Sequence, residues 1–121
     1  MNPQIKNNKH TPEFPTSEKC FIKEVWNSEG DKAVSIARAR VEKGVTTQWH
    51  YIKDTAERYV IVHGTGFVEV GEDIRQDVEV GDVVIIPPGC RQRITNTSEE
   101  DLVFDCICTP RFETKNYFEL D

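Results

Sequence analysis

The feature that most constrains this chain is a succession of short β-rich segments with no convincing helix between them. From Thr46 onward, stretches of valine, isoleucine and aromatic residues alternate with glycine, proline, asparagine and aspartate, which favour turns. Parallel strands would need helical crossovers, so the pattern predicts an all-β antiparallel sandwich or barrel. The predicted strands are residues 46–52, 58–62, 66–70, 76–80, 83–87, 92–95 and 101–108.

Two segments outside this series are harder to assign. The alanines and arginines of residues 34–41 favour a helix, but flanking turn residues leave about nine positions, which suits a strand better. Residues 113–120 are the one place where a short helix is expected. We therefore predict an N-terminal arm at 1–19, a barrel at 20–112, and a C-terminal tail or short helix at 113–121.

Composition excludes several classes of function. The chain has 121 residues, enough for one domain, and its 15 lysines and arginines against 21 aspartates and glutamates give a net charge of −6. A nucleic-acid partner is not expected, because phosphate binding needs clustered cations. No apolar run approaches the length of a membrane span, and residues 1–19 lack the apolar core of a signal peptide, so a cytoplasmic location with free thiols is expected.

Two blocks of residues carry a more specific signal. The first block contains Gly44, His50, Glu57 and Gly64, and the second contains Gly81, Pro87, Gly89 and Asn96. These blocks resemble the two conserved motifs of the cupin family, in which an HxH triplet and a glutamate are followed by a further histidine in the second block. The eight residues match the family pattern, whereas Ile52 and Gln92 stand where the family has histidine.

This resemblance implies a cupin fold, the double-stranded β-helix or jelly-roll barrel. In the family, the histidines and the glutamate bind one divalent transition metal inside the barrel, so the resemblance implies a metal site at His50, Glu57 and Gln92. The metal would be iron, manganese, zinc, nickel or copper; the alternative is a site that has lost its metal. Residues 50 and 52 share a strand face, so Ile52 should point inward with His50, although it cannot bind a metal.

Three further side chains are predicted at the pocket from their spacing. Gln48 shares the strand parity of His50, and Cys90 shares that of Gln92, which makes both candidate ligands. Tyr59 shares the parity of Glu57 and is a candidate proton carrier, with a core aromatic as the alternative.

Three functions are compatible with these residues. The first is a metal-dependent enzyme, an isomerase or a dioxygenase, acting on a small oxygen-rich substrate; in the isomerase case Glu57 is the base and Tyr59 the acid. The second is a non-catalytic module that binds a small ligand, which the loss of an imidazole at Ile52 supports. The third is a purely structural dimer component. A homodimer is expected in each case, with the N-terminal arm adding an edge strand to the partner.

Overall fold

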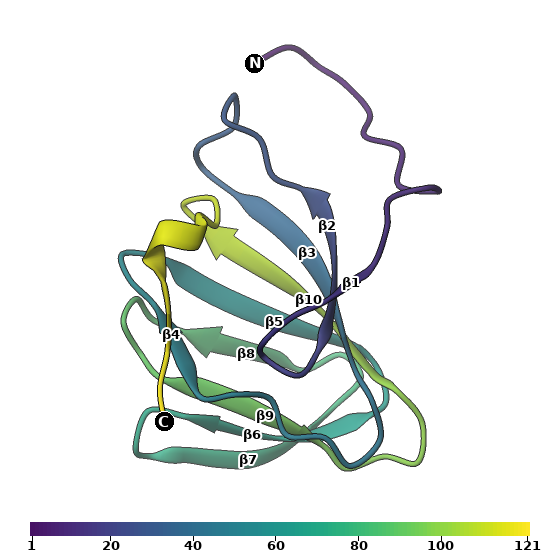
Figure 1. The fold of residues 1–121 in the computed structure, drawn as a ribbon, viewed down its shortest axis with the longest axis vertical. Coiled ribbons are helices and arrows are strands. Elements are labelled where there is room, and N and C mark those ends of the chain that lie inside the picture. Colours follow the sequence, from purple (N-terminus) through teal and green to yellow (C-terminus); the bar gives the residue numbers. More distant parts are fainter.

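The computed structural model describes all 121 residues and contains only strands, turns and one short helix. Figure 1 shows the strands stacked into a barrel, with the N-terminal segment extending away from it. The elements are β1 (Phe14–Pro15), β2 (Phe21–Trp26), β3 (Ser35–Val41), β4 (His50–Ile52), β5 (Ala56–His63), β6 (Thr65–Val70), β7 (Ile74–Glu79), β8 (Val83–Ile86), β9 (Gln92–Asn96), β10 (Leu102–Thr109), the 3-10 helix η1 (Thr114–Asn116) and β11 (Tyr117–Glu119).

The strands form two antiparallel sheets. The six-stranded sheet has the order β1-β2-β3-β10-β5-β8, and the five-stranded sheet has the order β11-β4-β9-β6-β7. Neighbours such as β3 and β10 are far apart in the sequence, as expected for a jelly roll. The predicted all-β antiparallel barrel is confirmed, and the ambiguous segment at 34–41 is strand β3.

Alternation along the strands decides which side chains enter the barrel. On β4, His50 and Ile52 are buried while Tyr51 between them is only half-buried. The same alternation buries Glu57, Tyr59 and Ile61 on β5. Apolar side chains fill one part of the interior as a packed core, namely Val41, Ile61, Val68, Val70, Val78, Val84, Ile86, Ile94 and Leu102.

The C-terminal tail differs from the prediction of a short helix. Only one 3-10 turn forms at Thr114–Asn116, and the chain then continues as β11, whose Tyr117 pairs with Ile52 of β4. Hydrogen bonds to the free backbone groups at the edge of β4 stabilise a strand here more than the weak local helix preference stabilises a helix. The segment predicted as a strand at 46–52 is regular only from His50, and before it Thr46 makes a single bridge to Thr95.

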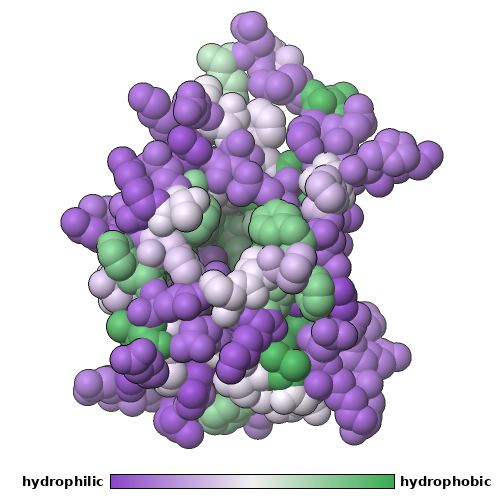
Figure 2. All heavy atoms as spheres, in the orientation of Figure 1, coloured by the Kyte–Doolittle hydropathy of each residue, from purple (hydrophilic) through white to green (hydrophobic).

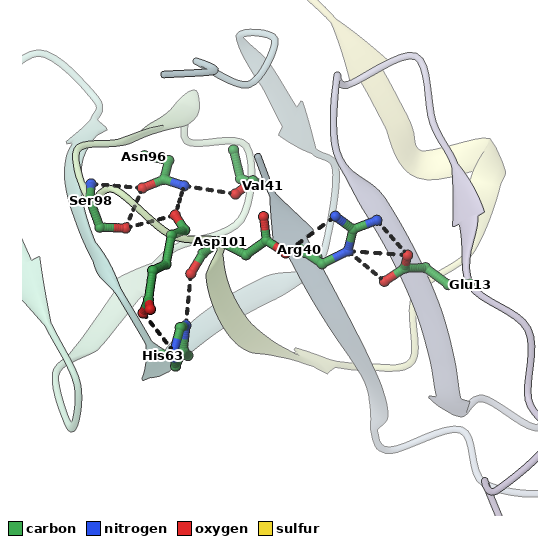
Figure 3. Close-up of polar contacts among 8 residues, drawn as sticks. Glu13, Arg40, Val41, His63, Asn96, Ser98 and Asp101 are labelled. Atoms are coloured by element: carbon green, nitrogen blue, oxygen red, sulfur yellow. Dashed lines mark hydrogen bonds and ion pairs between the residues drawn. The ribbon is translucent and has the colours of Figure 1, made fainter. Parts of the chain in front are cut away.

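Asn96 organises the turn between β9 and β10. Its side-chain amide donates to the carbonyls of Val41 (2.9 Å) and Glu100 (2.7 Å), and its side-chain oxygen accepts from the backbone N–H (2.8 Å) and the hydroxyl (2.6 Å) of Ser98 (Figure 3). Gly64, at φ 82°, lies against the same turn, where a Cβ would come within 2.8 Å of the carbonyl oxygen of Asp101. Only glycine fits at that position.

The N-terminal arm is fastened to the outside of β3 by Arg40. The guanidinium makes ion pairs with Glu13 at 2.7 Å and with Asp101 at 3.4 Å (Figure 3). Beyond Glu13, β1 pairs with β2 of the same chain rather than extending outward, and the backbone N–H of Gln48 donates to the carbonyl of Glu18 at 2.9 Å. Residues 13–20 are therefore held across one end of the barrel.

Replacing Arg40 by methionine is expected to loosen the arm without unfolding the barrel. Exposed ion pairs contribute about 1 kcal/mol or less, so the free energy of unfolding should change by no more than that. Amide exchange at Thr16 and Gln48 should become about fivefold faster. The matched control is Arg38→Met, also on β3, which breaks the ion pair to Asp105 of β10. Equal exchange rates in the two variants would show that Arg40 does not hold the arm.

The predicted homodimer stays a prediction. Val83 and Ile85 of the edge strand β8 are exposed, at 54% and 68%, and they offer an apolar surface to a second copy. β1 pairs with β2 of its own chain and forms the edge of the six-stranded sheet, and the pairing of the arm with a second copy stays a prediction. No helix here has the length and apolar character needed to span a bilayer.

Candidate functional site

A cavity of about 350 Å³ lies inside the barrel, within the range of small-molecule sites, roughly 300–1,000 Å³. Figure 2 shows a hollow on this face of the molecule, with hydrophobic side chains on its inner wall. The polar side chains that line the cavity include His50, Glu57, Glu18, Tyr59 and Tyr117. The apolar ones are Phe14, Cys20, Ile22, Ile36, Ala37, Ala39, Ile52, Phe104, Cys106, Cys108 and Phe112.

The cavity owes much of its space to β3. The inward positions Ser35, Ala37 and Ala39 all line the cavity, and all three side chains are small. Larger side chains at these positions would occupy the space that the cavity takes. The alanines that make residues 34–41 hard to assign from sequence thus help to leave space in the interior.

His50 is buried, at 3% exposure, and its ring is fixed at both nitrogens. Nδ1 lies 2.9 Å from the carbonyl oxygen of Gln48; because a carbonyl can only accept, Nδ1 carries the proton. Nε2 lies 3.8 Å from Oε2 of Glu18. With the proton of the neutral ring on Nδ1, Nε2 can accept a hydrogen bond. If Nε2 also takes up a proton, the positive ring lies beside the Glu18 carboxyl group.

Glu57 is the second buried polar group, at 7% exposure. Its Oε2 accepts a long contact from the Cys108 thiol at 3.7 Å, whereas Oε1 has no hydrogen-bond partner. Burial raises the pKa of Glu57 from 4.5 to about 7; the nearby His50 lowers it by a smaller amount and the carboxylate of Glu18 raises it. Near neutral pH this carboxyl can both give and take a proton.

Tyr59 and Gln92 form a buried pair beside Glu57. The Tyr59 hydroxyl donates to Oε1 of Gln92, and burial raises the pKa of Tyr59 well above 10, so the phenol stays neutral. The Gln92 side-chain nitrogen has no hydrogen-bond partner, although its amide contributes to lowering the pKa of Glu57. Gln92 is fully buried and does not line the cavity. Tyr59 thus orients an amide whose nitrogen is left unpaired.

Glu18 is a site residue that the sequence does not reveal, because residues 1–19 are expected to form an arm outside the barrel. It lines the cavity facing His50, and burial raises its pKa above the ordinary value while His50 lowers it. Close by, Ser17 donates a hydrogen bond to Glu119 of the C-terminal tail. No sequence motif identifies Glu18 as a site residue. The one signal in the sequence is that an acidic residue lies two positions before Cys20, which is buried.

The remaining predicted pocket residues divide into two groups. Ile52 lines the cavity, as expected from its parity with His50. Gln48 does not, because its side-chain amide donates to the Leu120 carbonyl of the tail. Cys90 lies outside as well, next to Gly71. Neither Gln48 nor Cys90 stands with His50 and Glu57 as the sequence prediction proposed.

Comparison with known proteins identifies the class of fold and then the family. Among solved structures, Streptomyces PAC13 with uridine has a TM-score of 0.82 at 14% identity over 99% of this chain and 92% of that one. KdgF from Halomonas sp. has a TM-score of 0.78 at 16% identity over 90% and 96%. A predicted oxalate decarboxylase from Thermotoga maritima has a TM-score of 0.78 at 20% identity over 88% and 99%. These likenesses establish a double-stranded β-helix fold.

The family follows from the sequence itself. The family model described as "Cupin domain" matches residues 37–109, more than half of the chain, and the chain belongs to this family. No curated protein matches the chain by sequence.

The cupin family implies a metal at this place, and the residues present do not fit one. Ile52 offers no donor atom, and Oε1 of Gln92 accepts the Tyr59 hydroxyl, which leaves an amide nitrogen that cannot bind a cation. No three histidine, cysteine, aspartate or glutamate side chains stand close enough together to hold a metal ion. His50 and Glu57 alone are fewer ligands than a stable transition-metal site uses.

Proposed function

We propose that this cupin is an enzyme that transfers protons on a small molecule bound in the cavity, as in an isomerisation or an elimination. One observation carries the proposal: Glu57, a buried carboxyl with a pKa of about 7, lines the same cavity as His50. Two proton-transferring groups in one water-poor pocket are what general acid–base chemistry requires. The proposal retains the predicted isomerase chemistry, but assigns the catalysis to His50 and Glu57 instead of a metal ion.

The two groups have different roles in this proposal. Above pH 7 Glu57 is ionised, and because it lines the cavity its carboxylate accepts a proton from a ligand carbon. His50, held through Nδ1 by the Gln48 carbonyl, exchanges a proton at Nε2 with a ligand oxygen. Tyr59 directs its proton to Gln92 and is a positioning residue.

The similar structures support this chemistry as one that the barrel can host. Pac13 is described as a nucleoside dehydratase, with a TM-score of 0.81 at 14% identity, and loss of water is a proton-transfer reaction. The predicted dioxygenase activity has less support, because it depends on a metal that the side chains here do not fit.

A binding module without catalysis is the second candidate. Ile52 lines the cavity where the family has a metal-binding histidine, which is what loss of catalysis in an ancestral enzyme would leave. The cavity and the burial of His50 and Glu57 would then serve recognition only.

Proton transfer can be tested before the substrate is known. The protein is incubated in D₂O with small hydroxylated and carbonyl compounds, and deuterium uptake or conversion is followed by proton NMR. We expect turnover that rises as pH increases through about 7, as Glu57 ionises, and that falls by about 10²–10⁴-fold in Glu57→Gln and in His50→Gln. Glu72→Gln, in the exposed turn between β6 and β7, is the control.

Two results would contradict the proposal. Unchanged turnover in Glu57→Gln would show that Glu57 is not the group that accepts the proton. Turnover that appears only after iron, manganese, zinc, nickel or copper is added would restore the metal-enzyme prediction. If no compound in the panel exchanges or reacts, the binding module becomes the better description.

A further inference from the structure

The ionisable side chains that line the cavity are mostly acidic. Three glutamates line it, Glu18, Glu24 and Glu57, together with the single histidine His50, and neither lysine nor arginine is among the lining residues. The arginines of β3 point away from the cavity and are already paired, Arg38 with Asp105 at 2.8 Å and Arg40 with Glu13 at 2.7 Å. No lysine or arginine is therefore available to a ligand inside.

This arrangement disfavours anionic ligands. A phosphate or carboxylate in the cavity would approach Glu18 and Glu57 without any arginine or lysine to bind it, and like charges repel strongly where water is scarce. Among small oxygen-rich molecules, sugar phosphates are therefore poor candidates for the ligand.

A positive charge, by contrast, would compensate the carboxylates of the lining, none of which is paired with a lysine or an arginine. Glu18 has one ion-pair contact, with His50 at 3.8 Å, so an ammonium N–H would supply a further donor and the opposite charge. Aromatic rings also line the cavity: Tyr117 lies 5.2 Å from the His50 ring and 6.4 Å from Phe112, while Tyr59 and Phe104 lie 4.4 Å apart. Aromatic faces stabilise cations and pack against apolar groups.

We propose that the cavity binds a small organic cation, a protonated amine on a compact apolar body, with the carboxylate of Glu18 binding the ammonium group. The apolar wall formed by Ile22, Ala37 and Ile52 accepts the rest of the ligand. This rests on the proposed function only in taking the cavity as the substrate site, and it narrows the substrate class to amines.

Three probes of nearly equal shape test the charge preference directly. Benzylamine, benzyl alcohol and benzoate are titrated into the full-length protein at pH 8 by calorimetry and ligand-observed NMR. We expect benzylamine to bind at least about tenfold more tightly than benzyl alcohol, and benzoate to bind more weakly than either. Equal affinities, tighter binding of benzoate or benzyl alcohol, or no binding of benzylamine would overturn the proposal.

Substitution at Glu18 locates the effect. Glu18→Gln should weaken benzylamine binding about tenfold and leave benzyl alcohol within about twofold. The control, Glu72→Gln, should change neither. A Glu18→Gln variant that binds both probes as the unmodified protein does would contradict the assignment of Glu18. Displacement of benzylamine by stoichiometric Mn²⁺ or Zn²⁺ would replace the organic cation by a metal ion and also overturn it.

The two proposals fail separately. Proton transfer on an uncharged compound that depends on Glu57, without benzylamine binding, would sink the amine inference and leave the proposed function intact. Tight benzylamine binding with no proton transfer in any panel would support the amine site and remove the catalytic role.

Discussion

Glu57→Gln is expected to make the protein more stable at pH 8, by about 3 kcal/mol. Burial raises the pKa of Glu57 from 4.5 to about 7, and a tenfold change in an ionisation constant corresponds to about 1.4 kcal/mol. The groups that face this carboxyl are His50, Glu18 and the thiols of Cys20, Cys106 and Cys108, and among the charged ones only His50 favours its ionised form. An isosteric neutral amide removes the unfavourable buried charge.

The pH dependence gives the sign of this effect. A carboxyl whose pKa is raised on folding contributes stability below about pH 4.5, and this contribution is lost as the pH rises toward 7. Urea unfolding should therefore give a higher free energy of unfolding for Glu57→Gln than for the unmodified protein. We expect this difference to be below about 1 kcal/mol at pH 5 and about 3 kcal/mol at pH 8. Glu72→Gln should show no such growth. Parallel curves for Glu57→Gln would mean that the carboxyl is not perturbed.

Asn96→Ala is expected to lower the free energy of unfolding by about 3 kcal/mol. Asn96 is 2% exposed and makes four hydrogen bonds, which tie together β3, the end of β9 and the turn before β10. Alanine would leave the Val41 carbonyl buried without this donor, and an unsatisfied buried group costs about 1–3 kcal/mol.

Thr97→Ala is the matched control for this prediction. Thr97 follows Asn96 in the same turn, is exposed, and makes one side-chain hydrogen bond, to Thr65 at 3.0 Å. We expect it to cost less than about 1 kcal/mol. Similar losses in the two variants, measured by urea unfolding at pH 7, would show that the burial of Asn96 adds nothing to the strength of its hydrogen bonds.

The fold is predictable from the sequence because strand alternation and turn residues are local properties. The period-two pattern places His50, Ile52, Glu57 and Tyr59 on inward faces of the barrel, and the structure buries all four. In the tail, predicted as a tail or short helix, a 3-10 turn forms at Thr114–Asn116, but the sequence does not reveal β11, which pairs with an edge that forms elsewhere in the chain.

The site is only partly predictable, for a related reason. Parity tells which face a side chain occupies but not how far along the barrel it lies, so it selects Gln48 and Cys90 although neither lines the cavity. Glu18 escapes prediction because its place depends on long-range contacts of the arm, among them the bond from Gln48 to the Glu18 carbonyl. The hydrogen bond between Tyr59 and Gln92 is likewise a contact between distant strands.

The three small inward residues of β3 have a consequence for how this barrel could be re-engineered or diversify. Ser35, Ala37 and Ala39 line the cavity from β3, whereas His50 and Glu57, the side chains proposed to transfer protons, lie on β4 and β5. Under the proposed function, ligand size and reaction chemistry are encoded on separate strands. A single enlargement, such as Ala37→Leu, would reduce the volume of the cavity while His50 and Glu57 keep their arrangement.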